Sequence, residues 1–282
     1  MKNILVPIDF SGHSYKALYF AAEIAKAAGA GLLLLFVNDV VDSPFRKKTV
    51  LELKHKMSFD DAVQLELTII KKNIEETMHV PTRIRISAGH TQDAIIDTIN
   101  DDHSDLIVMG TLGEAAFKEK LLGSITAAVI GKSSVPVLAI PLLSEWNVPK
   151  HILLVVNKFE EDSENIADPA FELAELFGAR VTVAVFNDED NGFSLEFMQN
   201  KRNILAFEQK LQSTHEATAV KPDTLHGHKF QETLDEYIDE HYVDILVMLT
   251  HKRNFAESIF NRSMTKKMSY HTDIPLLAIP VH

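Results

Sequence analysis

The residues best suited to chemistry are a spaced set of glycines and a serine near the middle of the chain. The run Met109-Gly110-Thr111-Leu112-Gly113 is followed, after nine intervening residues, by Gly123-Ser124. Glycine has no Cβ, so the backbone at these positions can approach a bound ligand closely. A Gly-Ser pair at the start of a helix offers free backbone N–H groups at the positive end of the helix dipole. The pattern therefore predicts a site for a phosphate-bearing ligand such as a nucleotide.

The motif lies between a predicted strand at 105–109 and a predicted helix that begins at Ser124. The same alternation fills the first half of the chain. Strands are expected at 3–8, 32–37, 82–87 and 135–140, and helices at 16–25, 60–78 and 91–101, the last of them capped by Thr91. Strands and helices that alternate at this spacing predict an α/β fold, with a doubly wound parallel sheet of the Rossmann-like type.

Three residues lie at or just beyond the ends of predicted strands, namely Asp9, Val37 and Gly110. In open parallel sheets, ligands bind at the carboxyl ends of the strands, near the point where the strand order reverses. We therefore expect these residues to share one crevice.

The chain contains an internal repeat. Residues 105–109 have a counterpart at 244–248, and residues 136–141 have one at 275–280, both at an offset of 139 residues. A Gly-His pair at 89–90 is matched, one residue short of that offset, by a second pair at 227–228. Because these matching segments occur in the same order in both halves of the chain, they predict two tandem domains, 1–143 and 149–282.

The composition is that of an ordinary globular protein. Of its 282 residues, 46% are apolar and 24% are charged, with no cysteine and a net charge of −12. The lack of cysteine excludes disulfides and thiolate metal sites, and the negative charge argues against non-specific nucleic-acid binding. No apolar run reaches the about 18 residues of a membrane span, and the first residues lack a signal-peptide pattern. We expect a cytoplasmic protein that binds neither nucleic acid nor membranes.

In its motifs the chain resembles the universal stress protein family, in a tandem two-domain form. The resemblance rests on residues 4–9, 36–39, 87–90 and 136–141 and on the Gly-x2-Gly-x9-Gly-Ser motif. It implies two universal-stress-type domains and a role in a stress response. It also implies that the first domain binds an adenine nucleotide, with ATP as the leading candidate, magnesium as its companion, and ADP, AMP and cyclic AMP left open.

The resemblance also assigns roles to single residues. In the ATP-binding branch of the family, the residues matched by Asp9 and Val37 hold the adenosine end of the nucleotide. The glycine loop and the Gly-Ser turn hold the ribose and the phosphates. The implied site consists of Pro7, Asp9, Val37, Met109, Gly110, Gly113, Gly123, Ser124, Ile125 and Thr126.

The second copy has lost the glycines of this motif. Leu249, Lys252 and Arg262 stand in their places, and only Ser263 keeps the identity of its counterpart. A side chain at a position of positive φ costs about 1 kcal/mol, and its bulk fills the site. We expect the second domain to be a structural or regulatory partner that does not bind ATP in this way, although its basic residues leave another anion open. The other replaced positions are Val155, Asn157 and Phe186.

Two other functions are alternatives to simple nucleotide binding. A slow ATPase or phosphotransferase needs a positioned water or nucleophile and a metal-bound triphosphate, and the sequence shows no evident general base or Walker lysine. We therefore expect no enzyme. A nucleotide-independent adaptor is the other alternative, and the intact glycine motif argues against it.

The sequence also bears on metal and partner sites. His226, His228 and His241 match no standard zinc spacing, so we expect no metal site. The apolar strands at 135–140 and 274–279 would be sheet edges, which proteins normally cover. By resemblance, the two copies would pair through them as a pseudo-dimer within the chain, with homodimerisation and an unidentified protein partner left open.

Overall fold

The structure is a computed structural model, and it divides into two compact units, Met1–Leu142 and Leu143–His282. The residues that it describes are 1–39, 58–111, 122–156, 166–191, 202–203, 205–206, 209, 211–215, 218–251 and 273–281.

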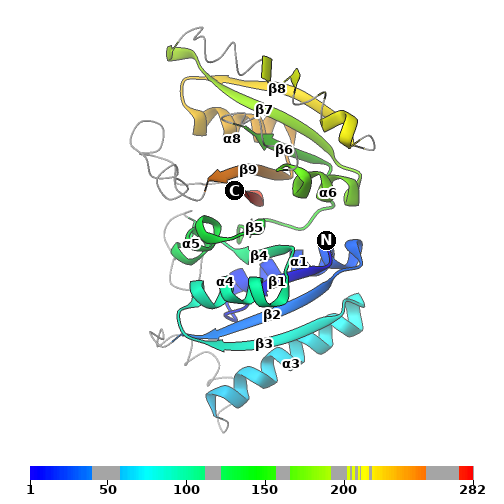
Figure 1. Cartoon of the computed structure of the whole chain (residues 1–282), viewed down its shortest axis with the longest axis vertical. Coiled ribbons are helices and arrows are strands. Elements are labelled where there is room, and N and C mark those ends of the chain that lie inside the picture. Colours follow the sequence, from blue (N-terminus) through cyan, green and yellow to red (C-terminus); the bar gives the residue numbers. More distant parts are fainter. Residues whose placement is uncertain are drawn as a thin grey trace. The chain divides into compact units, whose positions relative to one another are not determined.

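The first unit is built on a parallel sheet with the strand order β3-β2-β1-β4-β5 (Figure 1). From β1 the chain moves outward to β3 and then returns to the other side of β1 with β4. The order therefore reverses between β1 and β4, which confirms the predicted doubly wound sheet. The strands are β1 Asn3–Pro7, β2 Gly31–Asn38, β3 Thr82–Ala88, β4 Leu106–Gly110 and β5 Val137–Ile140.

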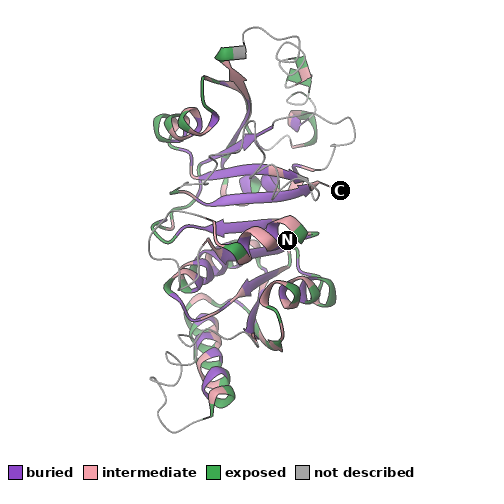
Figure 2. Cartoon of the chain, turned by 90° about the vertical axis from the view of Figure 1, so that its left-hand side faces the viewer, coloured by how far each residue is buried: buried purple, intermediate pink, exposed green. Residues whose placement is uncertain are grey.

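Helices cover both faces of this sheet. Helix α1 packs beside α3, and α4 packs beside α5, so the inner strands are enclosed. Residues 32–37 of β2 are all buried, as expected for an apolar strand covered on both faces (Figure 2). The helices are α1 Gly12–Ala28, α3 Phe59–Met78, α4 Thr91–Asp102 and α5 Ser124–Lys132.

The start of α4 differs from the prediction. Its N-cap is His90, whose side chain makes no capping hydrogen bond, and Thr91 is already helical. The capping group comes from Asp39, after β2, whose Oδ2 accepts hydrogen bonds from the Thr91 backbone N–H at 3.1 Å and from its hydroxyl at 3.0 Å. Thr91 is therefore not the N-cap, because a carboxylate distant in sequence takes that role.

The second unit repeats the arrangement of the first. Its parallel sheet has the order β10-β9-β6-β7-β8, which corresponds strand for strand to that of the first unit (Figure 1). Over the described parts of the chain, no helix is long and apolar enough to cross a membrane. The elements are β6 His151–Val155, α6 Asp168–Phe177, β7 Arg180–Asp188, the 3-10 helix η1 Glu189–Asn191, β8 Val220–Gly227, α8 Phe230–His241, β9 Ile245–His251 and β10 Leu276–Val281.

A repeated aspartate ties the first strand of each sheet to the strand beside it. Asp105, before β4, accepts hydrogen bonds from the backbone N–H groups of Lys2 and Asn3 at the start of β1. Asp244, before β9, accepts from Lys150 at 2.8 Å and from His151 at 2.9 Å at the start of β6. The carboxylate thus satisfies backbone donors at the amino edge of each sheet, away from the edge where a ligand is expected.

Candidate functional site

The candidate site lies at the carboxyl edge of the first sheet, where β1, β2 and β4 end. Pro7 and Gly110 are the last residues of β1 and β4, and Val37 is one residue from the end of β2. The parallel pairing of β1 with both neighbours brings these ends to one edge. Val37 is only 4% exposed and Met109 is also buried, so neither offers a ligand much side-chain surface. Gly113 lies outside the described residues.

Asp9 is held in place at this edge by the start of α1. Its Oδ1 accepts hydrogen bonds from the Ser11 hydroxyl at 2.6 Å and from the Ser11 backbone N–H at 3.1 Å. Ser11 is the N-cap of α1, and its hydroxyl oxygen accepts from the backbone N–H of Ser14 at 3.2 Å. The carboxylate is therefore fixed beside the end of β1, while the residue remains partly exposed.

Phe10 shapes the turn between β1 and α1, a role that was not predicted from the sequence. Its φ of 61° is in the left-handed region, which costs a bulky residue about 1–2 kcal/mol. Its ring is buried and stacks on Phe36 of β2, with 5.3 Å between ring centroids. Burial of this ring offsets the backbone strain and holds the turn against the sheet.

Gly110 is required by packing rather than by its backbone angle. A Cβ at this position would lie 2.8 Å from the His13 Cβ and 2.9 Å from the His13 carbonyl oxygen. Neither Gly110 nor Gly123 has a positive φ, and Gly123 has φ −60° and ψ 150°, which any residue can adopt. The positive-φ argument is therefore wrong for these two glycines. At Gly110, glycine is required because α1 approaches β4 too closely to leave room for a side chain.

Among the described residues, the first backbone N–H groups of α5 have no acceptor within the helix. Its N-cap, Gly123, provides no side-chain cap, and the first helical hydrogen bond runs from the Ala127 N–H to the Gly123 oxygen at 2.9 Å. The N–H groups of Ser124, Ile125 and Thr126 therefore precede the hydrogen-bonded part of the helix. Ser124 is exposed, so this helix start is open to an anion, which the helix dipole would favour.

Thr126 connects the helix to the strand end. Its buried hydroxyl donates a hydrogen bond of 2.8 Å to the carbonyl oxygen of Gly110. The Gly123 N–H also donates to the Thr111 oxygen. These two hydrogen bonds hold the start of α5 at the end of β4, so the motif glycines at 110 and 123 lie at one place in the fold.

Replacing Thr126 with valine is expected to lower the free energy of unfolding of the first unit by about 1–2 kcal/mol. Valine keeps the volume of this buried side chain but leaves the Gly110 carbonyl oxygen without the hydroxyl that donates to it. Thr126→Ser keeps the hydroxyl and is the matched control. Urea denaturation followed by circular dichroism measures both variants, and equal losses in both would show that the hydrogen bond contributes nothing.

The corresponding edge of the second unit is built differently. Leu249, within β9, stands where β4 has its final glycine. Phe186, which replaces Val37, packs edge-on against Phe230 of α8 with 5.3 Å between ring centroids. Four replaced or matching positions of the second copy lie outside the described residues. They are Asn157, Lys252, Arg262 and Ser263.

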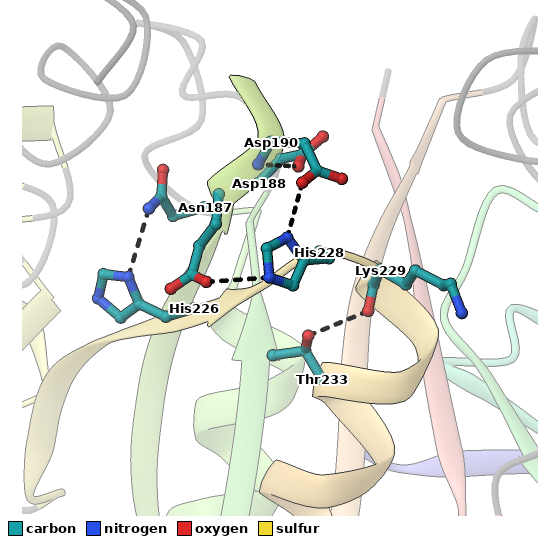
Figure 3. Close-up of polar contacts among 8 residues, drawn as sticks. Asn187, Asp188, Asp190, His226, His228, Lys229 and Thr233 are labelled. Carbon is teal, nitrogen blue, oxygen red and sulfur yellow. Dashed lines mark hydrogen bonds and ion pairs between the residues drawn. The ribbon is translucent and has the colours of Figure 1, made fainter. Parts of the chain in front are cut away.

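Two of the histidines considered for a metal site, His226 and His228, contact different residues at the end of β8 (Figure 3). His228, after β8, has its Nδ1 2.7 Å from Asp190 Oδ1 and its Nε2 3.6 Å from Glu189 Oε2. The hydrogen bond to Asp190 is the main cause that raises the pKa of His228. His226 contacts Asn187, with 3.3 Å between Nδ1 and Nδ2. In the first unit the matching histidine is His90, and its Nδ1 lies 3.9 Å from Asp39 Oδ1.

Comparisons with known proteins point to one family. A model of the universal stress protein family matches residues 1–141 and again residues 149–280. Universal stress protein MJ0577 of Methanocaldococcus jannaschii is 30% identical over 155 residues, which cover 49% of this chain and 94% of that protein. A universal stress protein of Thermus aquaticus is 31% identical over 147 residues, with coverages of 49% and 98%.

A solved structure covers both units. A universal stress protein from Archaeoglobus fulgidus superposes with a TM-score of 0.70 at 17% identity, over 99% of this chain and 98% of that one. At this identity the likeness shows a shared tandem fold.

Proposed function

The chain belongs to the universal stress protein family, and on that premise we propose that its first unit binds an adenine nucleotide, with ATP as the expected ligand. The supporting observation is that three features meet at the point where the strand order reverses. They are the anchored carboxylate of Asp9, the close-packed Gly110 and the open start of α5.

The two ends of the nucleotide would meet different chemistry at this edge. The N–H groups of residues 124–126 suit the phosphates, because they precede the helical hydrogen bonds and lie at the positive end of the dipole. Asp9 can accept a hydrogen bond from a hydroxyl of the ribose or from the amino group of the base. Magnesium would bind with the triphosphate, as it does with most bound ATP.

The second unit is proposed as a partner that does not bind ATP. The Phe186–Phe230 contact and the leucine at position 249 supply bulk at its carboxyl edge. The proposal has two further parts. The second unit pairs with the first as a pseudo-dimer. In a cytoplasmic stress response, the protein communicates to a protein partner whether nucleotide is bound.

Calorimetric titration of ATP tests the proposal. The wild-type chain is expected to bind one ATP, and Gly113→Lys, which copies Lys252, is expected to weaken binding at least tenfold, or about 1.4 kcal/mol. Gly131→Lys is the matched control, because a Cβ there would meet no neighbouring atom within 4 Å. ADP, AMP and cyclic AMP are titrated alongside, and phosphate release is followed in the same samples.

The outcomes separate the alternatives. Absence of binding by the wild-type chain would overturn the nucleotide proposal in favour of an adaptor. Two ATP per chain would show that the second unit also binds. Phosphate release by the wild-type chain that is lost in Gly113→Lys would establish an enzyme.

A further inference from the structure

His13 has a buried polar atom that the fold itself does not use. The residue lies in the first turn of α1, and its side chain is partly exposed. Its Nδ1 atom is buried, and the described parts of the chain give it no hydrogen-bond partner. Buried polar atoms in native proteins are nearly always paired, and an exception calls for an explanation such as a ligand.

The position of His13 places it at the candidate site. Its Cβ and carbonyl oxygen are the atoms that exclude a side chain at Gly110, so the residue lies directly against the end of β4. The α5 start is joined to that strand end through the hydrogen bond from Thr126 to the Gly110 oxygen. His13 therefore lies beside the strand end to which the proposed phosphate-binding helix start is joined.

Electrostatics make this imidazole responsive to an anion. Burial lowers the pKa of His13, and the negative charge of Asp9 opposes that effect. Asp9 is the charged group that acts on the ring among the described residues, and β4 contributes only uncharged side chains beside it. Phosphate brought near the ring would favour its charged form, because an opposite charge stabilises the imidazolium.

We propose that His13 contacts the bound nucleotide and donates a hydrogen bond from Nδ1 to a phosphate oxygen. The inference rests on the proposed function and deepens it, because it adds a residue from α1 to a site otherwise formed by the strand ends and α5. It also makes nucleotide binding stronger as the pH falls from 8 to 6, since the imidazole takes up a proton on binding.

The test compares two substitutions by ATP titration at pH 6, 7 and 8. His13→Leu removes the hydrogen bond, and His13→Asn keeps an N–H donor near the place of Nδ1. Affinity at pH 7 is expected to fall at least tenfold in His13→Leu and to be largely restored in His13→Asn. His226→Leu, in the second unit, is the matched control and is expected to bind like wild type.

The pH dependence separates a ligand contact from a packing role. The phosphates of ATP also titrate near neutral pH, so the readout is the difference between the slopes of wild type and His13→Leu. The wild-type slope is expected to be the steeper of the two. Equal affinity and equal slopes in both proteins would overturn the inference and leave the proposed function intact. Absence of ATP binding by the wild-type chain would overturn both.

Discussion

Gly110→Leu, which copies Leu249 of the second unit, is expected to lower the free energy of unfolding of the first unit by about 3 kcal/mol or more. The atoms in the way are the His13 Cβ at 2.8 Å and the His13 carbonyl oxygen at 2.9 Å. A Cβ and a backbone oxygen of a helix cannot be moved by a change of side-chain rotamer, so either α1 or the end of β4 has to shift.

Urea denaturation of the full chain, followed by circular dichroism, measures this effect in the transition assigned to the first unit. Gly110→Ala introduces the Cβ alone and is expected to show most of the loss. Gly131→Ala in α5 is the matched control, because no atom lies within 4 Å of its Cβ position. It is expected to raise stability by about 0.5–1 kcal/mol. A Gly110→Ala protein as stable as wild type would show that α1 does not approach β4 this closely.

Acidification from pH 7 to pH 5 is expected to destabilise the second unit through His151. The residue is 3% exposed, its Nε2 lies 2.8 Å from the Thr182 hydroxyl oxygen, and its Nδ1 lies 3.0 Å from the His241 carbonyl oxygen. Burial is the main cause that lowers the pKa of His151, and the charge of Arg180 lowers it further. The hydrogen bond to His241 and the charge of Asp244 act in the opposite direction.

The sign of the effect follows from the direction of this shift. Because the folded pKa is below the unfolded value of about 6.5, the unfolded chain binds more protons between the two values. The contribution of His151 to stability is therefore complete above about pH 6.5 and is lost as the pH falls through that range towards the folded pKa.

His151→Asn isolates this contribution, because it copies Asn3, the first residue of β1, at the matching position of the first unit. Thermal unfolding by calorimetry at pH 7, 6 and 5 is expected to show a smaller fall in the midpoint for the variant. The wild-type midpoint should fall by several degrees more, at about 4 °C for each kcal/mol lost. Parallel pH profiles in the two proteins would assign the acid sensitivity to other groups.

The alternation of strands and helices, the doubly wound parallel sheet and the duplication were predicted from the sequence, but the contacts at the strand ends were not. Apolar runs at fixed spacing predicted the alternation, because they are local features of the sequence. Repeated segments at a constant offset predicted the duplication, because they can be recognised by comparing the sequence with itself. The role of Gly110 depends on where α1 begins relative to a strand about a hundred residues later. The predicted helix began at Lys16, whereas α1 begins at Gly12.

Because of that difference, the role of His13 was not predicted. A start at Lys16 leaves His13 in a loop, whereas the observed start places it in the first helical turn against β4. The signal that could have found it is the Ser11-x-x-Ser14 spacing, since a serine three residues before a helical N–H is a common N-cap. The left-handed backbone of Phe10 had no such signal, because bulky residues rarely adopt it.

The equivalent aspartates at positions 105 and 244 of the two copies suggest how a duplicated domain can diverge. Each ties together the amino ends of its sheet in the same way, although the motif that follows β4 has been rewritten after β9. These ties lie at the amino ends of the strands, away from the carboxyl edge where we propose that the first unit binds a nucleotide. One copy could therefore change its carboxyl-edge loops without losing the aspartate ties of its sheet. For protein engineering, this recommends the carboxyl-edge loops of the second unit as the place to graft new binding sequences, with both aspartates left unchanged.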